Sequence, residues 1–301
     1  MANTIMTRFL VLSDTHGADA ERLKIPTLPE VDVAIHCGDL THDSGLEEYH
    51  TAIRLLHSIR ASLKLVIAGN HDWTLDPVAY QRGYQKACQK RCNQAISPDN
   101  AAATFTQDHG EPGDAKALFD TQEAKAAGIV FLDEGTHTFS LQNGAALSVY
   151  ASPFTTSTDP KWGFQYNDKH EWTIRSNVDI AITHGPPAGI MDRANPLNHA
   201  GCPDLFAAVA RAKPLMHCFG YVHRSWGAEK VVWRNAVLDR WRKPSYERAI
   251  EHKRTVVLAT LEKEKVEQYD ETSFCMAQEP IKRGKETLFV NAANEGARRG
   301  R

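Results

Sequence analysis

The chain has 301 residues, of which 42% are hydrophobic and 24% are charged, and this composition is typical of a globular protein with a large core. A formal net charge of -2 gives no electrostatic reason to expect a nucleic-acid or membrane partner. No apolar run approaches the roughly 20 residues that a transmembrane helix needs, and the polar first residues predict no signal peptide. The six scattered cysteines lack zinc-site spacing, so we expect reduced thiols in a cytoplasmic protein.

Five short apolar runs share one feature, which is that polar residues able to bind a metal follow each of them. The runs are residues 9–12, 33–35, 65–68, 180–182 and 215–219. The residues that follow them are, in the same order, Asp14 and His16, then Asp39, then Asn70 and His71, then His184, then Tyr221 and His223. Continuous apolar runs of this length are typical of strands that are buried on both faces of a sheet.

A helix is predicted between the second and third of these runs. Apolar residues recur at helical spacing from Leu46 to Ile59, and Ser44 with Glu47 predicts a capping box at the start. The result is a βαβ unit, which requires parallel strands. Because the carboxyl ends of such strands meet at one edge of a sheet, we expect the five polar groups to converge there.

The rest of the chain is predicted to extend the same domain. Polar, Ala-rich composition indicates helices and a loop outside the central sheet at 76–128, and the charged stretch 239–254 indicates another helix. Further strands are predicted at 129–132, 137–141, 146–150, 231–233, 255–261 and 287–290. We therefore expect a single domain over 1–301, with a helical insertion at 76–128 and a divergent insertion at 226–286.

The converging residue types suit the hydrolysis of a phosphate ester. This reaction needs a nucleophile aimed at phosphorus and positive charge to stabilise the oxygens around it, and two divalent metal ions about 3.5–4 Å apart supply both. Carboxylates, imidazoles and an amide oxygen are suitable ligands for such ions. The five groups after the apolar runs contain these ligand types.

The ordered series Asp-x-His, Gly-Asp, Gly-Asn-His, His and Gly-x-x-His resembles the signature of the calcineurin-like metallophosphoesterase family. Most of residues 8–227 share this resemblance, and the branch of metallophosphoesterase-domain-containing, class III phosphodiesterase-like proteins is the most similar. Stretches typical of that branch are residues 66–71, 151–154, 182–187, 201–203 and 289–293. The resemblance implies a four-layered α/β/β/α sandwich of two mixed β-sheets flanked by helices.

The same resemblance implies a role for each site residue and a centre of two divalent ions, of manganese, iron, zinc or magnesium. The implied ligands are Asp14, His16 and His223 for the first ion, Asn70 and His184 for the second, and Asp39 as a bridge between them. Of these, Asn70 is also implied to contact substrate. The resemblance makes His71 and Asp39 the catalytic residues, and His71 is implied to face the substrate and protonate the leaving group.

One position departs from the family pattern, because Tyr221 stands where the family has a histidine ligand of the second ion. A neutral phenol, with a pKa of about 10, is a poorer ligand than imidazole at pH 7. Two hypotheses follow: the second ion binds weakly and turnover is slow, or Tyr221 ligates as a phenolate and turnover is ordinary. In either case Tyr221 would contact the substrate.

The function that we expect is that of a metal-dependent phosphodiesterase, which acts through a metal-bound hydroxide on nucleotides or cyclic nucleotides. A protein phosphatase or nuclease is a second possibility, but it would need a basic groove that the charge balance does not support. A third is a low-activity nucleotide-binding or scaffold protein, with a second metal site weakened by Tyr221. The sequence gives no indication of the oligomeric state.

Several other aromatic and histidine residues are close to the motifs. The apolar runs contain His36 and His217, which we interpret as core residues with satisfied hydrogen bonds. Because His42 follows Asp39 closely in the sequence, a further possibility is that it contacts a metal ligand without binding the metal itself. The aromatic residues of a later loop would either stack on a substrate ring or pack within that loop, and they are Trp162, Phe164 and Tyr166.

Overall fold

The computed structural model describes residues 5–23, 30–92, 98–157, 159–234, 243–260 and 280–294. Its first sheet has four strands, and all of them are parallel. They are β1 (Phe9–Leu12), β2 (Val31–His36), β3 (Ala61–Val66) and β4 (Ile129–Phe131), in this spatial order. The predicted βαβ unit is present, since α1 (Leu46–Ser58) connects β2 to β3.

The second sheet has seven strands and is mixed. In spatial order they are β14 (Val256–Thr260), β13 (Gly227–Val232), β15 (Glu286–Asn291), β12 (Met216–Phe219), β9 (Ile180–Thr183), β6 (Ala146–Ser152) and β5 (Gly135–Ser140). The central strands, from β15 to β6, are parallel to one another. The central strands β9 and β12 therefore deliver their carboxyl ends to one edge, as β1–β3 do in the first sheet.

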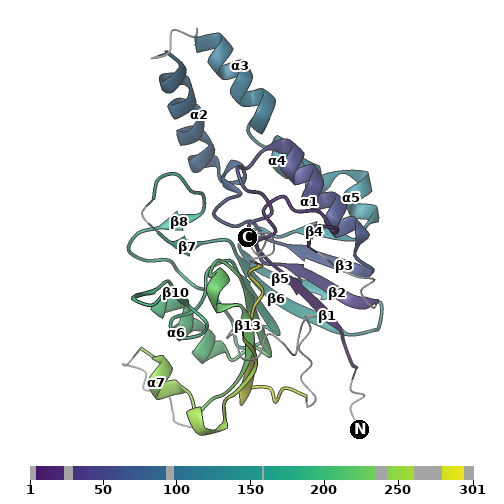
Figure 1. Cartoon of the computed structure of the whole chain (residues 1–301). Coiled ribbons are helices and arrows are strands. Elements are labelled where there is room, and N and C mark those ends of the chain that lie inside the picture. Colours follow the sequence, from purple (N-terminus) through teal and green to yellow (C-terminus); the bar gives the residue numbers. More distant parts are fainter. Residues whose placement is uncertain are drawn as a thin grey trace.

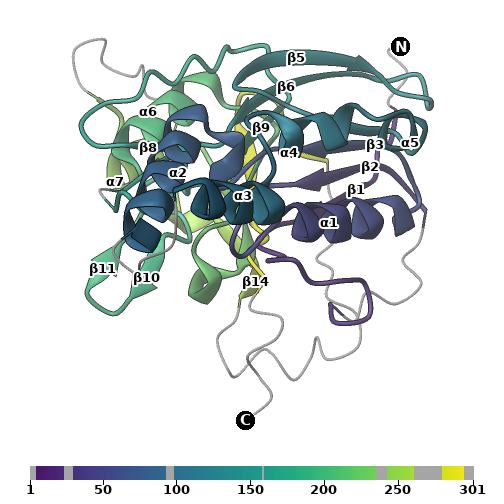
Figure 2. The same ribbon diagram turned by 90° about the horizontal axis from the view of Figure 1, so that it is seen from above.

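The remaining elements are helices and short ribbons. The helices are α2 (Pro77–Cys92), α3 (Pro98–His109), α4 (Asp114–Ala117), α5 (Gln122–Ala126), α6 (Pro203–Ala212) and α7 (Tyr246–Ala249). The ribbons pair β7 (Thr155–Thr156) with β8 (Gln165–Tyr166), and β10 (Arg193–Asn195) with β11 (Asn198–His199). The helices α2 and α3 project from the top of the molecule in Figure 1 and lie in front in Figure 2. Among the described residues, no helix has the length and apolar character needed to span a membrane.

Alternating side chains of the strands build the four layers that the resemblance implied. Val33 and Ile35 on β2 face the space between the sheets, where they pack against residues such as Val149 and Ile182 of the second sheet. Ala34 faces the opposite way, into a cluster with α1 and α5. Beyond the second sheet, α6 and α7 cover its outer face (Figure 1). The expected α/β/β/α sandwich is therefore confirmed, with one sheet parallel and the other mixed.

Two local predictions were wrong. The capping box does not involve Ser44 and Glu47, because α1 begins one residue later and Glu48 accepts a hydrogen bond of 3.0 Å from the Gly45 N–H. The helix predicted over 239–254 is only the four-residue α7 and a 3₁₀ turn at His252–Arg254 in the part that is described. Residues 239–242 of the predicted helix, and residue 261 of the strand predicted over 255–261, lie outside the described residues.

Candidate metal centre

The loops that follow β1, β2, β3, β9 and β12 meet at one edge of the two sheets. Backbone hydrogen bonds hold them together: the Asp14 N–H donates to the Gly38 carbonyl at 2.9 Å, and the Gly220 N–H donates to the His184 carbonyl at 3.1 Å. All five polar groups predicted from the sequence therefore lie in one place. The convergence follows from the parallel direction of these strands.

One part of this site is fully buried and contains Asp39, Asn70 and His184. The Nε2 atom of His184 lies 3.3 Å from Oδ1 of Asp39 and 2.9 Å from Oδ1 of Asn70. His184 is 0% exposed, and Asp39 is only 2% exposed. A carboxylate, an amide oxygen and an imidazole thus point to a common position.

The neighbouring part is more open and contains Asp14, His16 and His223. The Nε2 atom of His223 lies 3.1 Å from Oδ1 of Asp14 and 3.5 Å from Nε2 of His16. Asp39 reaches this part too, since its Oδ2 lies 3.9 Å from Nε2 of His16. The candidate ligand atoms of Asp14, His16 and His223 lie within 4.8 Å of one another, and so do those of Asp14, Asp39 and His184. The two groups are therefore adjacent and share Asp14, and this donor set fits hard or borderline divalent ions.

Hydrogen bonds to backbone carbonyls orient two of the imidazoles. The Nδ1 atom of His184 lies 2.8 Å from the Cys37 carbonyl oxygen, and Nδ1 of His16 lies 3.1 Å from that of Thr41. A carbonyl oxygen can only accept, so each Nδ1 carries the proton of this bond. Histidines that bind metals commonly show this arrangement, because it fixes the ring and leaves Nε2 for the ion.

The charges of the buried part are strongly coupled. Burial opposes the charge on His184, but the Asp39 carboxylate raises the pKa of His184 to about 9. Burial also opposes the charge on Asp39, yet His184 holds the pKa of that carboxyl well below its usual range. A proton on His184 Nε2 therefore occupies the position that an ion would take. We expect metal binding to release this proton, so metal affinity falls as the pH falls below about 9.

The backbone at the site is held in an unusual conformation. Of the eight described non-glycine residues with positive φ, four lie here, namely Asp14 (56°), His16 (47°), Asp39 (54°) and Tyr221 (68°). Each such residue costs of order 1–3 kcal/mol, and residues of this kind cluster at active sites. Half of the described residues with this conformation are thus predicted site residues, which supports a functional reason for the strain.

Two glycines allow the loops to approach closely. A Cβ atom on Gly69 would lie 2.3 Å from Oδ1 of Asp39 and 2.7 Å from Cε1 of His184, and one on Gly220 would lie 2.2 Å from Oδ2 of Asp14. These distances are shorter than any real contact. A side chain at either position would therefore displace a candidate ligand.

His71 lies at the open side of the site, next to Asp39. Its N–H donates to Oδ1 of Asp39 at 2.8 Å, and its Nδ1 donates to the His42 carbonyl at 2.6 Å. The ring of Trp162 lies against it, with 4.0 Å between the ring centroids. The remaining nitrogen, Nε2, is thus available to a substrate.

The three aromatic residues named from the sequence have different places. Trp162 packs against the site residue His71. Phe164 packs edge-on against Phe154, and Tyr166 packs edge-on against Trp172. The interpretation as a packed loop therefore describes Phe164 and Tyr166, whereas Trp162 is in a position to contact a substrate.

Tyr221 lies beside the buried part of the site. Its backbone N–H donates to Oδ2 of Asp14 at 3.0 Å, and its ring packs edge-on against His184 at 5.5 Å between centroids. Burial and the negative charges of Asp39 and Asp14 raise the pKa of the Tyr221 phenol. The protein by itself therefore keeps this side chain neutral.

Sequence reasoning missed Asp72, which is 0% exposed. Its carboxylate accepts hydrogen bonds from the backbone N–H groups of Leu40 (3.1 Å), Thr41 (2.9 Å) and Gly69 (2.8 Å). It thereby joins the loop that carries Asp39 to the loop that carries Asn70. Burial and the nearby charge of Asp39 raise the pKa of Asp72 to about 7.

Asn291 was quoted only as part of a family stretch, yet it supports the loop that carries His223. Its Nδ2 donates to the carbonyl oxygens of Val222 and Ser225, both at 3.0 Å. The position of Asn291 directly after an apolar strand was the signal that could have indicated this role.

The two interior histidines, His36 and His217, are buried as expected. Each interior histidine has a threonine partner. Nε2 of His36 lies 3.0 Å from Thr15 Oγ1, and Nε2 of His217 lies 2.9 Å from Thr183 Oγ1. Burial lowers the pKa of His36 to about 4 and that of His217 to about 3, so both are neutral. Among the described residues, Nδ1 of neither ring has a hydrogen-bond partner, so their satisfaction is only partial.

Comparison with known proteins identifies the family. The family model "Calcineurin-like phosphoesterase" matches residues 7–216, which is more than half of the chain. The chain belongs to the calcineurin-like phosphoesterase family. Membership supports a metal-dependent phosphoester hydrolase, and the candidate ligand clusters described above agree with it.

Several named proteins are similar to this family member. The human "Metallophosphoesterase domain-containing protein 1" is 27% identical over 73% of the chain and 62% of its own length. "UPF0046 protein T07D4.2" of Caenorhabditis elegans is 27% identical over 73% of the chain and 52% of its own length. "Probable rhamnogalacturonate lyase C" of Emericella nidulans is 31% identical over 76% of the chain, but the match spans only 18% of that protein.

The matched region thus spans less than two thirds of each of these relatives. Among solved structures, the protein TT1561 of Thermus thermophilus covers 72% of the chain and 82% of its own chain, with 12% identity and a TM-score of 0.41.

Proposed function

We propose that this calcineurin-like phosphoesterase hydrolyses phosphodiesters with two divalent ions, of manganese, iron, zinc or magnesium. The observation that supports the proposal is the convergence of two ligand groups, which meet at Asp14 and Asp39. Asp14, His16 and His223 would hold one ion and Asn70 and His184 the other, with Asp39 between them. Bound there, the ions would neutralise charge on the phosphoryl oxygens and activate water.

The residues of the chain would handle the proton of the leaving group. Nδ1 of His71 donates to the His42 carbonyl, and this bond directs Nε2 away from the loop. His71 would therefore hold a proton at Nε2 and give it to the departing oxygen. Trp162 would keep the ring in place, because it covers one face of His71.

Nucleotides, including cyclic nucleotides, are the substrate class that we favour, and a cytoplasmic location suits such substrates. The support is the resemblance to the metallophosphoesterase-domain-containing branch, together with an aromatic ring, Trp162, at the open side of the site. Aromatic side chains that lie beside a phosphate site can stack on a nucleobase. Asn70, His71 and Tyr221 would then contact the substrate phosphate.

The test of the proposed function is hydrolysis of bis-p-nitrophenyl phosphate with manganese. We expect His71→Ala to lower kcat by about 10²–10⁴-fold, the usual contribution of a general acid, while bound manganese per chain is unchanged. His50→Ala is the matched control, since His50 is an exposed histidine on α1. A wild type without metal-dependent turnover, or a His71→Ala variant that keeps its rate, would refute the proposal.

A low-activity, nucleotide-binding protein is a second candidate, which the neutral Tyr221 phenol favours. If this candidate is correct, the wild type holds one ion tightly and the second weakly, and Tyr221→His strengthens the second site by more than about tenfold. Isothermal titration calorimetry, in which the metal is titrated into the protein, measures the affinities of both sites. A wild type that already holds two tight ions contradicts the weak-site hypothesis.

A further inference from the structure

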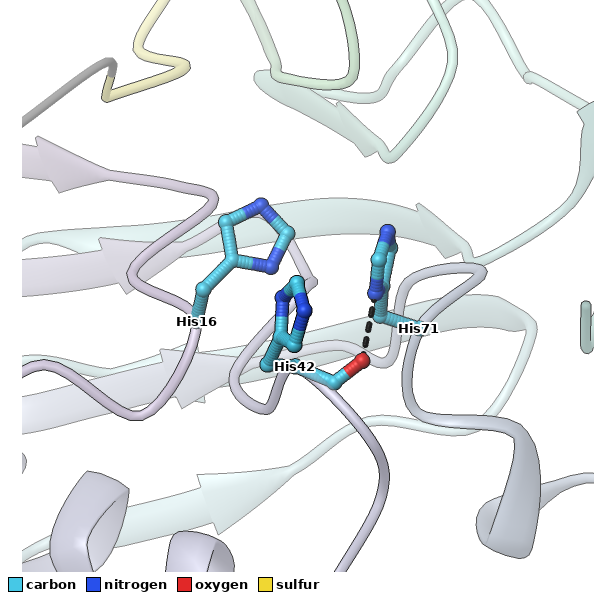
Figure 3. Close-up of side chains that lie close together, drawn as sticks. All are labelled: His16, His42 and His71. Carbon is cyan, nitrogen blue, oxygen red and sulfur yellow. Dashed lines mark hydrogen bonds between the residues drawn. The ribbon is translucent and has the colours of Figure 1, made fainter. Parts of the chain in front are cut away.

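A third group of possible metal ligands lies at the open side of the site and shares only His16 with the two groups described above. It contains His16, His42 and His71, each of which offers one ring nitrogen, and these atoms lie within 4.8 Å of one another. Ring centroids are 5.8 Å apart for His16 and His42, 5.4 Å for His42 and His71, and 4.6 Å for His16 and His71. Figure 3 shows the three rings gathered around one space.

The ligand chemistry of this group differs from that of the other two groups. It contains three imidazoles and no carboxylate, whereas each of the other groups contains Asp14. Imidazole favours zinc and similar borderline ions, while magnesium and manganese favour oxygen ligands. Three histidines with one open position form a common zinc site in proteins.

The local geometry allows the rings to close around an ion. Zn–N distances of about 2.0–2.1 Å place tetrahedral ligands roughly 3.3 Å apart, so the nitrogens need to approach by no more than about 1.5 Å. His42 is exposed and its side chain can rotate. Backbone carbonyls accept from Nδ1 of both His16 and His71, which leaves Nε2 of each ring for a ligand.

Two of these histidines also have roles in the proposed reaction. His16 is a candidate ligand of the first ion, which would still have Asp14, Asp39 and His223 if His16 turned to another ion. His71 is the proposed proton donor. An ion bound by all three rings would therefore remove His71 from the substrate and weaken the first site at the same time.

We propose that His16, His42 and His71 form a site for zinc, or a similar borderline ion, whose occupation inhibits the enzyme. The inhibitory consequence rests on the proposed hydrolysis, but the binding of zinc does not. His42 is the residue specific to this site, because its side chain belongs to neither of the other ligand groups.

Zinc content measures the binding directly. The wild type, His42→Ala and His50→Ala are each equilibrated with Zn²⁺ at concentrations up to well above that of the protein, and bound zinc per chain is determined by elemental analysis. We expect His42→Ala to bind one zinc ion fewer than the wild type, and His50→Ala to equal the wild type. Equal zinc content in the wild type and His42→Ala would overturn the site, and so would an equal loss in His50→Ala, since it would indicate general surface binding.

Zinc inhibition tests the consequence separately. Manganese-supported hydrolysis is measured with added zinc, and each rate is divided by that of the same variant without zinc. We expect inhibition of His42→Ala to need at least roughly tenfold more zinc than inhibition of the wild type. Equal sensitivity would overturn the inhibitory role. If no variant hydrolyses the substrate but zinc contents still differ by one ion, the proposed function fails and the zinc site stands.

Discussion

Asp39→Asn is expected to lower phosphodiester hydrolysis by more than about 100-fold and to remove at least one metal ion per chain. Asp39 lies between both parts of the site, with Oδ1 at 3.3 Å from His184 Nε2 and Oδ2 at 3.9 Å from His16 Nε2. Removing a residue that hydrogen-bonds to a metal ligand typically lowers metal affinity or activity by 10–100-fold. Removing a ligand that both ions share is therefore expected to lower them further. Asparagine keeps the size and the hydrogen bond to the His71 N–H, but it removes the charge.

The matched control for this variant is Asp43→Asn, because Asp43 is an exposed carboxylate four residues further along the same loop. Manganese content by elemental analysis and hydrolysis of bis-p-nitrophenyl phosphate measure the two effects. Asp43→Asn is expected to match the wild type in both. An Asp39→Asn protein that keeps two ions and a rate within a few-fold of the wild type would show that Asp39 does not bridge the ions.

Gly220→Ala is expected to have the second large effect, on both stability and metal binding. The added Cβ would lie 1.9 Å from Ser13 Oγ and 2.2 Å from Asp14 Oδ2, and both neighbours are buried. Rotation of the Ser13 hydroxyl would not relieve the clash, because Ser13 Cβ would also lie 2.8 Å away. We therefore expect the loop after β1 to shift and Asp14 to leave its position beside His223. Overpacking of this kind typically lowers the free energy of unfolding by about 1–3 kcal/mol.

Gly45→Ala is the control for Gly220→Ala, because its φ of -80° is ordinary and the nearest atom to its added Cβ is 3.5 Å away. Urea unfolding and metal content are measured for both variants. The account predicts a clear loss of stability and bound manganese only for Gly220→Ala. Wild-type values for both quantities in Gly220→Ala would mean that the close approach of Gly220 to Asp14 is not required.

The convergence of the ligands could be predicted because it depends on strand direction alone. Apolar runs located the strands, and the requirement that a βαβ unit be parallel placed Asp39 and Asn70 at one edge. The family resemblance extended this to Asp14, His184 and His223. These predictions needed no knowledge of side-chain contacts.

The residues that support the ligands could not be predicted in the same way. The role of Asp72 depends on where the backbone N–H groups of Leu40, Thr41 and Gly69 point, and this is known only once two loops are folded together. The helix at 239–254 was predicted from charge, which indicates exposure rather than helical structure. The place of His42 beside His71 depends on a tertiary contact through a backbone carbonyl.

The most direct test of the central claim is anomalous X-ray scattering from crystals of the wild type grown with manganese. The account predicts two peaks about 3.5–4 Å apart, with Asp39 in contact with both ions, Asp14 and His223 at one, and His184 at the other. A map with no peak at this edge of the sheets, or with an ion that Asp39 does not touch, would contradict it.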